Sequence, residues 1–87
     1  MPDPTSYRPV FSADATDFIV GLPKRRQQRV VLLAERLAVN PFILSDYSVP
    51  DESGRPVEHL LVEDYVFAYW IDHASKEVRI TDIEDAS

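Results

Sequence analysis

Cysteine is absent from the 87-residue chain, which excludes disulfide bonds, cysteine nucleophiles and thiolate metal sites. Glycine occurs only twice, and no glycine-rich phosphate loop is present. No apolar run approaches the ~18 residues that a membrane-spanning helix needs, and the first residues lack the basic-then-apolar pattern of a secretory signal. We therefore expect a single cytoplasmic domain over residues 1–87 that uses no cofactor, no metal and no membrane.

Basic residues are scarce in the second half of the chain. Residues 46–87 carry three Lys or Arg against eleven Asp or Glu, whereas residues 1–45 carry six against four. The formal net charge is −6. Binding of nucleic acid over a broad surface needs clustered Lys and Arg, so this balance argues against it and leaves room only for a local basic patch.

Residues 1–6 contain two prolines and no periodicity, and we expect them to form a loose N-terminal tail. Residues 7–11 are expected to form a short edge strand, because Pro9 cannot donate a hydrogen bond within a sheet. A short helix should follow, with Ser12 as its N-cap and Gly21 at its end. Its apolar face would consist of Ala15, Phe18, Ile19 and Leu22.

The clearest helix is predicted from Pro23 to about Val39, a stretch with no glycine and no internal proline. Asn40-Pro41 should end it. Its buried face is expected to consist of Val30, Leu33, Ala34 and Leu37, with Ala38 at the edge. Because the turn between the two helices is so short, they should form a hairpin or a sharp bend.

After Pro41 the pattern changes to strands rich in β-branched and aromatic residues. A strand is possible at residues 43–49, and clearer strands are predicted at 57–62, 65–71 and 77–83, with hairpin connections between the last three. We therefore predict an α+β fold. It has a short N-terminal strand, a two-helix hairpin and a three- to four-stranded antiparallel sheet.

The hairpin loops fix the pairing of these strands. A two-residue loop at 63–64 places Leu60 opposite Phe67, and a four-residue loop at 73–76 places Trp70 opposite Arg79. Alternation then gives one apolar face, which the helices should cover: Leu60, Val62, Tyr65, Phe67, Tyr69, Ile71, Val78 and Ile80. The opposite, open face should hold Arg55, Val57, His59, Leu61, Val66, Ala68, Trp70, Arg79, Thr81 and Ile83.

Three segments resemble the RelE/ParE superfamily, the toxins of bacterial type II toxin–antitoxin pairs. LPKRRQQRVVLLAERLAVNP resembles the Leu-Pro-led second helix of that superfamily. SGRPVEHLLVEDYVFAYWID resembles its pair of central strands, and KEVRITDIED resembles its final strand. The resemblance extends over roughly residues 7–84.

This resemblance implies a compact α+β toxin fold and a cognate antitoxin as partner. It also implies one of two activities: metal-independent cleavage of mRNA on the ribosome, or inhibition of DNA gyrase. In the ribonucleases of the superfamily, basic residues on the open sheet face handle the phosphate. The matching positions here fall near Val57 and His59, and the arginine after the turn tyrosine falls at Val66. The C-terminal Arg-and-Tyr segment has no counterpart. The ribonuclease residues are therefore degenerate, and the alternative is a non-catalytic interaction module that retains the fold.

Two residues of the open face are candidates for catalysis of RNA cleavage. His59 has the pKa range of a base for the 2′-hydroxyl, and the forked donors of Arg79 suit a phosphate. Tyr47 or His73 would have to approach as the acid. The alternative is structural: His59 is a solvated strand residue, and Arg79 stacks on Trp70 as a cation–π pair.

Candidate partner-binding residues lie on the long helix and on the open face. The basic group at the start of the helix could contact nucleic acid or an acidic partner, or could simply be a solvated face. Leu32 and Val39 lie on the polar side of the helix, where they could dock an antitoxin helix or a second copy of the chain. The candidates are Lys24, Arg25, Arg29, Leu32, Val39 and Trp70.

Overall fold

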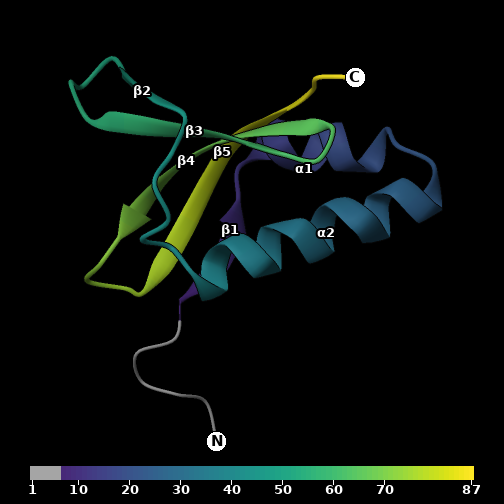
Figure 1. Ribbon diagram of the computed structural model, residues 1–87, viewed down its shortest axis with the longest axis horizontal. Helices are drawn as coiled ribbons and strands as arrows, with labels where there is room; N and C mark the ends of the chain where they lie inside the picture. The colour runs from purple at the N-terminus through teal and green to yellow at the C-terminus, as the bar shows by residue number, and fades with distance from the viewer. Residues whose placement is uncertain (1–6) are drawn as a thin grey trace, which may run out of the picture.

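A five-stranded mixed sheet with two helices against it makes up the fold (Figure 1). The structure, a computed structural model, describes residues 7–87, so the predicted tail lies outside the described residues. The elements in chain order are β1 (Arg8–Phe11), α1 (Ala13–Val20), α2 (Lys24–Val39), β2 (Tyr47–Pro50), β3 (Pro56–Val62), β4 (Tyr65–Asp72) and β5 (Glu77–Asp85). The predicted α+β class is confirmed.

The sheet is larger than predicted, because the N-terminal strand belongs to it. The strand order is β1-β5-β4-β3-β2. β1 pairs in parallel with β5, and all other neighbouring strands are antiparallel. Pro9 is tolerated in β1 because this strand lies at the edge of the sheet. β2 forms the opposite edge and is shorter than the predicted strand at 43–49.

The first helix begins where its sequence predicts. The Ser12 side chain accepts a hydrogen bond from the Ala15 backbone N–H at 3.1 Å and donates one to the Thr81 carbonyl at 2.7 Å. One hydroxyl therefore caps α1 and fixes its start to β5. Pro23 occupies the N-cap of α2 rather than its first turn, and α2 begins at Lys24. A proline there removes no helical hydrogen bond.

The long helix buries the predicted residues. Val30, Leu33, Ala34, Leu37 and Ala38 are all buried, in one core cluster with the apolar face of the sheet. α1 and α2 lie side by side in Figure 1, and both pack into that cluster. No helix among residues 7–87 is long and apolar enough to cross a membrane.

The predicted register is confirmed, with one irregularity. Leu60 pairs with Phe67, and Trp70 pairs with Arg79. A β-bulge between Ala68 and Tyr69 leaves Thr81 of β5 without an opposite residue. Thr81 Oγ1 lies 3.2 Å from the Ala68 carbonyl oxygen, to which it donates a hydrogen bond.

Beyond the bulge, the side chains of β5 lie on the opposite faces of the sheet from those predicted. Ile83 pairs with Phe67 and is only 2% exposed in the core. The prediction that Ile83 lies on the open face was therefore wrong. Strict alternation assumes an uninterrupted ladder, and one extra residue shifts every later side chain to the other face.

Candidate functional site

His59 lies half-buried on the open face, in the middle of β3. Its ring stacks on the Tyr47 ring of β2, with centroids 4.6 Å apart and planes 9° apart. Its Nδ1 lies 3.1 Å from the Val57 carbonyl oxygen, which can only accept a hydrogen bond. Nδ1 therefore donates this hydrogen bond, and Nε2 is the ring nitrogen that can accept a proton when the imidazole is neutral.

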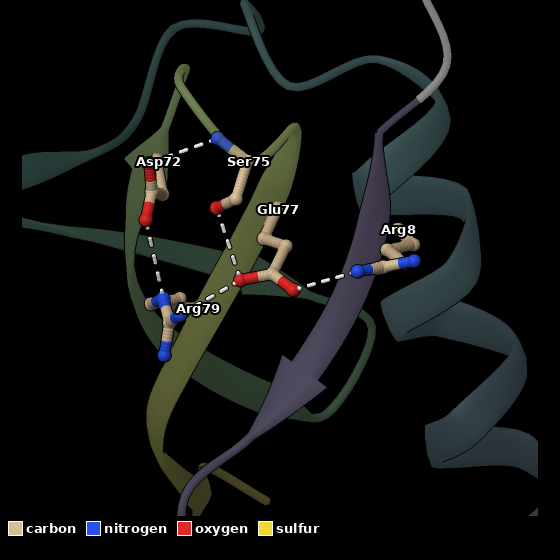
Figure 2. Close-up of polar contacts among 5 residues, drawn as sticks. All are labelled: Arg8, Asp72, Ser75, Glu77 and Arg79. Carbon is tan, nitrogen blue, oxygen red and sulfur yellow. Dashed lines mark hydrogen bonds and ion pairs between the residues drawn. The ribbon is translucent and has the colours of Figure 1, made fainter. Parts of the chain in front are cut away.

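Arg79 lies on β5 between two carboxylates (Figure 2). Its Nη2 is 2.8 Å from Glu77 Oε1, and its Nε is 3.6 Å from Asp72. Glu77 is the buried charged residue of the described chain, and it also bonds Arg8 of β1 at 3.1 Å and Ser75 at 3.1 Å. The network joins β1, β4 and β5. The charge of Arg79 is therefore already compensated within the chain.

The structure places His59 and Arg79 on the same face but does not bring them together. His59 pairs with Ala68, whereas Arg79 pairs with Trp70, on opposite sides of β4. Their Cα atoms are about 12 Å apart, because the two residues are separated by two strand spacings across the sheet and by two residues along it. Each side chain also has other partners. Among residues 7–87, no group of three or more His, Cys, Asp or Glu could hold a metal ion.

Trp70 carries a cation–π pair with Arg79, as its cross-strand position predicts. The Arg79 guanidinium carbon is 5.6 Å from the ring centroid. Arg55, from the turn that precedes β3, is closer, at 3.9 Å. Sequence reasoning assigned Arg55 to the open face but not to a site. In the predicted register Arg55 lies diagonally across from Trp70, and this position could have indicated the contact between them.

The basic residues in the first half of α2 fall into two groups. Arg26 forms an ion pair with Asp85 at 2.9 Å and donates a hydrogen bond to the Tyr65 hydroxyl at 2.7 Å. Arg29 forms a bidentate ion pair with Glu63. These contacts tie α2 to the sheet. Lys24 and Arg25 are exposed, and no ion pair among residues 7–87 involves them.

The apolar candidates of α2 are also exposed. Val39 is 82% exposed at the end of the helix. Leu32 lines an open hollow of about 520 Å³ together with Ile19 and Val31. The residues that line this hollow belong to α1 and α2.

A second hollow, the 41–45 groove, lies between the connection from α2 to β2 and the neighbouring ends of β3 and β4. It has a volume of about 510 Å³. Trp70 and Arg55 line it from the sheet, and Phe42, Ile43 and Leu44 line it from the connection. The sequence did not single out residues 42–44, because Ile43 and Leu44 were assigned to the possible strand at 43–49 and Phe42 directly precedes it.

The carboxylates of the Arg79 network predict a loss of stability in acid. The hydrogen bond from Arg8 lowers the pKa of Glu77, with Ser75 and Arg79 adding to the shift, and the hydrogen bonds from Ser75 lower the pKa of Asp72. A carboxyl with a lowered pKa binds protons more readily in the unfolded chain. Its contribution to stability is therefore present above about pH 4 and is lost as the pH falls further. We expect the melting temperature to fall steadily between pH 5 and pH 3, as calorimetry would measure.

Replacement of Glu77 tests that prediction. Glu77→Gln should lower the melting temperature at pH 7 and flatten its decline below pH 5. Glu84→Gln, an exposed carboxylate on the same strand, is the control and should leave the slope unchanged. A wild-type melting temperature that stays constant from pH 6 to pH 3 would contradict the prediction.

No protein-family model and no curated protein matches the sequence. Solved structures do match it over nearly its whole length. A chain of the RelBE2 toxin–antitoxin complex from Mycobacterium tuberculosis superposes with a TM-score of 0.75 and 21% identity, covering 100% of both chains. The chain has a RelE-like fold.

Two further complexes agree with the RelE-like fold. The archaeal RelE–RelB complex from Pyrococcus horikoshii OT3 contains a chain with a TM-score of 0.68 and 15% identity, covering 94% of this chain and 97% of that one. The intact E. coli RelBE toxin–antitoxin complex contains one with a TM-score of 0.66 and 15% identity, covering 94% and 99%. The predicted resemblance is confirmed at the level of fold. The catalytic and partner-binding roles stay predictions.

Proposed function

We propose that this protein is the toxin component of a toxin–antitoxin pair and binds a cognate antitoxin in the cytoplasm. The observation that carries the proposal is the agreement of the whole fold with chains from three toxin–antitoxin complexes. The exposed apolar side chains of Leu32 and Val39 on α2 support a protein-binding role, and so does the half-buried Trp70, which lines the 41–45 groove. Lys24, Arg25 and Arg29 complete the proposed partner-binding set.

For the activity of the toxin we propose metal-independent cleavage of mRNA during translation, with gyrase as the other target. The candidate base on the open face is His59, whose Nε2 would take the proton of a 2′-hydroxyl while its Nδ1 bonds the Val57 carbonyl. Tyr47 stacks on His59 and is half-exposed, so its hydroxyl is the nearest candidate acid. Arg79 would supply the cation for the phosphate.

A second candidate function is a non-catalytic interaction module. Two observations favour it: Asp72 and Glu77 already neutralise Arg79, and Val66 stands where the resembling ribonucleases have an arginine. Such a protein would bind its antitoxin or another partner without harming the cell.

Induced expression in bacteria separates these functions. A toxin should arrest growth, and co-expression of a small protein encoded beside it should restore growth. If the toxin cleaves RNA, His59→Ala should lower cleavage in vitro by about 10²–10⁴-fold. His73→Ala is the matched control. His73 was the other candidate acid, but it lies in the β4–β5 turn, five residues beyond the Ala68 that pairs with His59, and it bonds Tyr7.

The other results are equally informative. Arrest that survives both His59→Ala and Arg79→Ala, with loss of DNA supercoiling, assigns gyrase as the target. Harmless expression of the folded protein, with no RNA cut in vitro, supports the interaction module. Harmless expression together with no binding partner encoded nearby contradicts the toxin–antitoxin proposal.

A further inference from the structure

The hollow beside α2, which we call the α1–α2 hollow, presents apolar side chains at the surface of the helical hairpin. It has a volume of about 520 Å³. Leu32 is 40% exposed there, and Ile19 and Val31 are half-buried. The other lining residues are Gln27, Gln28 and Glu35. A second surface that covers the hollow would remove the three apolar side chains from water, which favours association.

One stripe of α2 runs along this hollow and carries opposite charges at its two ends. The stripe consists of Lys24, Gln28, Val31 and Glu35, whose spacing of i, i+4, i+7 and i+11 places them within about 60° of one another around the helix. The last three line the hollow, and Lys24 lies one turn before them. Eleven residues of helix separate the positive end from the negative end by about 16 Å.

The charged ends of the stripe have no partner of opposite charge within residues 7–87. Lys24 and Glu35 are both exposed, and none of the ion pairs in this part of the chain involves either of them. Lys24 also lies in the first turn of α2, which contains no acidic residue and where the helix dipole disfavours a cation. The stability of the helix therefore does not account for Lys24, whereas a contact with another molecule would.

The stripe is complementary to a second copy of itself. The midpoint between residues 24 and 35 falls at the level of residues 29 and 30, and Gln28 and Val31 lie at equal distances on either side of it. A two-fold axis perpendicular to α2 at this level sets two copies of the helix antiparallel. Lys24 of each copy then lies beside Glu35 of the other, whereas a parallel arrangement would place like charges together.

We propose that the protein forms a two-fold symmetric dimer in which α2 packs antiparallel against α2 of a second copy, over the α1–α2 hollow. Ion pairs between Lys24 and Glu35 close the interface at both ends, and Ile19 and Leu32 of each copy are covered between them. Each copy carries a net charge of −6, which opposes association, and the contact is small. The dimer is therefore weak and forms in proportion to concentration. It goes beyond the proposed function, because it needs no antitoxin.

A helix of the antitoxin is the competing occupant, since Lys24 and Leu32 belong to the proposed partner-binding set. To match the stripe, such a helix would need an acidic residue opposite Lys24 and a basic residue opposite Glu35, about 16 Å apart. A second copy of α2 carries both charges at this spacing and in this order. The spacing of the charges therefore favours the second copy.

Sedimentation equilibrium tests the dimer. The average mass of the 9.9 kDa chain should rise toward twice that value as the concentration increases. Lys24→Glu and Glu35→Lys should each weaken association by at least about tenfold, because each places like charges together at both ends of the interface. The two substitutions change the net charge by two units in opposite directions, so a general effect of net charge cannot weaken both.

A mixture of the two variants tests the antiparallel arrangement. Lys24→Glu and Glu35→Lys should each be monomeric alone and should form a heterodimer together, because the acidic stripe of one then meets the basic stripe of the other. Arg36→Glu is the control: it makes the same change of charge as Lys24→Glu at an exposed position about 100° around α2 from Glu35, and should not weaken the dimer. Circular dichroism would establish that each variant is folded, as expected for exposed positions.

Three results would overturn the inference: a monomer mass at every concentration, association unaffected by the two charge reversals, or a mixture of the two variants that stays monomeric. A monomeric chain that loses binding of an antitoxin on Leu32→Ala would assign the hollow to the antitoxin instead. Failure of the proposed function looks different. If an antitoxin restores growth but the chain alone stays monomeric, only this inference fails. If the chain dimerises as described but is harmless and has no antitoxin, only the toxin proposal fails.

Discussion

Replacing Phe67 by alanine is expected to lower the free energy of unfolding by about 3–5 kcal/mol. Phe67 lies on β4, the middle strand of the sheet, and is 0% exposed. It pairs with Leu60 on one side and with Ile83 on the other, under the helical hairpin. Truncation removes the apolar contacts of the ring and leaves a cavity that these neighbours fill only in part.

A loss of that size is a large share of the roughly 5–15 kcal/mol that stabilises a typical domain. Urea denaturation followed by circular dichroism would measure it. Leu61→Ala is the control, because Leu61 is 53% exposed on the open face of the neighbouring strand, and it should cost far less. Equal losses for the two variants would show that the helices do not cover the Phe67 face.

Ile83→Ala is expected to cost about 2–5 kcal/mol, by the same cavity mechanism. This variant tests the β-bulge directly. With the bulge, Ile83 packs in the core against Phe67; with uninterrupted alternation it would face solvent, where truncation costs within about 0.5 kcal/mol. The same urea titration distinguishes the two arrangements.

The neighbouring residue provides the control for Ile83. Glu84 is exposed and pairs with Val66, and Glu84→Ala should change the free energy of unfolding by less than about 0.5 kcal/mol. A small loss for Ile83→Ala together with a large loss for Glu84→Ala would place the chain in the unbulged register.

Much of the fold could be predicted because its determinants are local. The spacing of Val30, Leu33 and Leu37 on one helical face needs only the pitch of a helix. The pairings of Leu60 with Phe67 and of Trp70 with Arg79 follow from the lengths of two short loops. The open-face position of His59 then follows from the register.

The features that escaped prediction depend on long-range contacts. The parallel pairing of β1 with β5 joins Arg8 to Glu77, and no local pattern encodes it. The bulge leaves Thr81 unpaired in the register, and its hydroxyl bonds the Ala68 carbonyl of the neighbouring strand. Phe42 and Leu44 have the composition of a strand but remain outside the sheet, because β2 begins only at Tyr47. The carboxylates around Arg79 converge from the β4–β5 hairpin, which the sequence predicts as a hairpin but not as an ion network.

The pairing of β1 with β5 also constrains when the protein can fold during its synthesis. The last strand supplies Val78, Ile80 and Ile83 to the core and lies between β1 and β4. Until β5 has left the ribosome, β1 has no neighbour and the apolar face of α2 covers an incomplete sheet. The nascent chain therefore acquires its native core only after β5 has been translated, and a chain that still lacks β5 exposes apolar surface in the meantime.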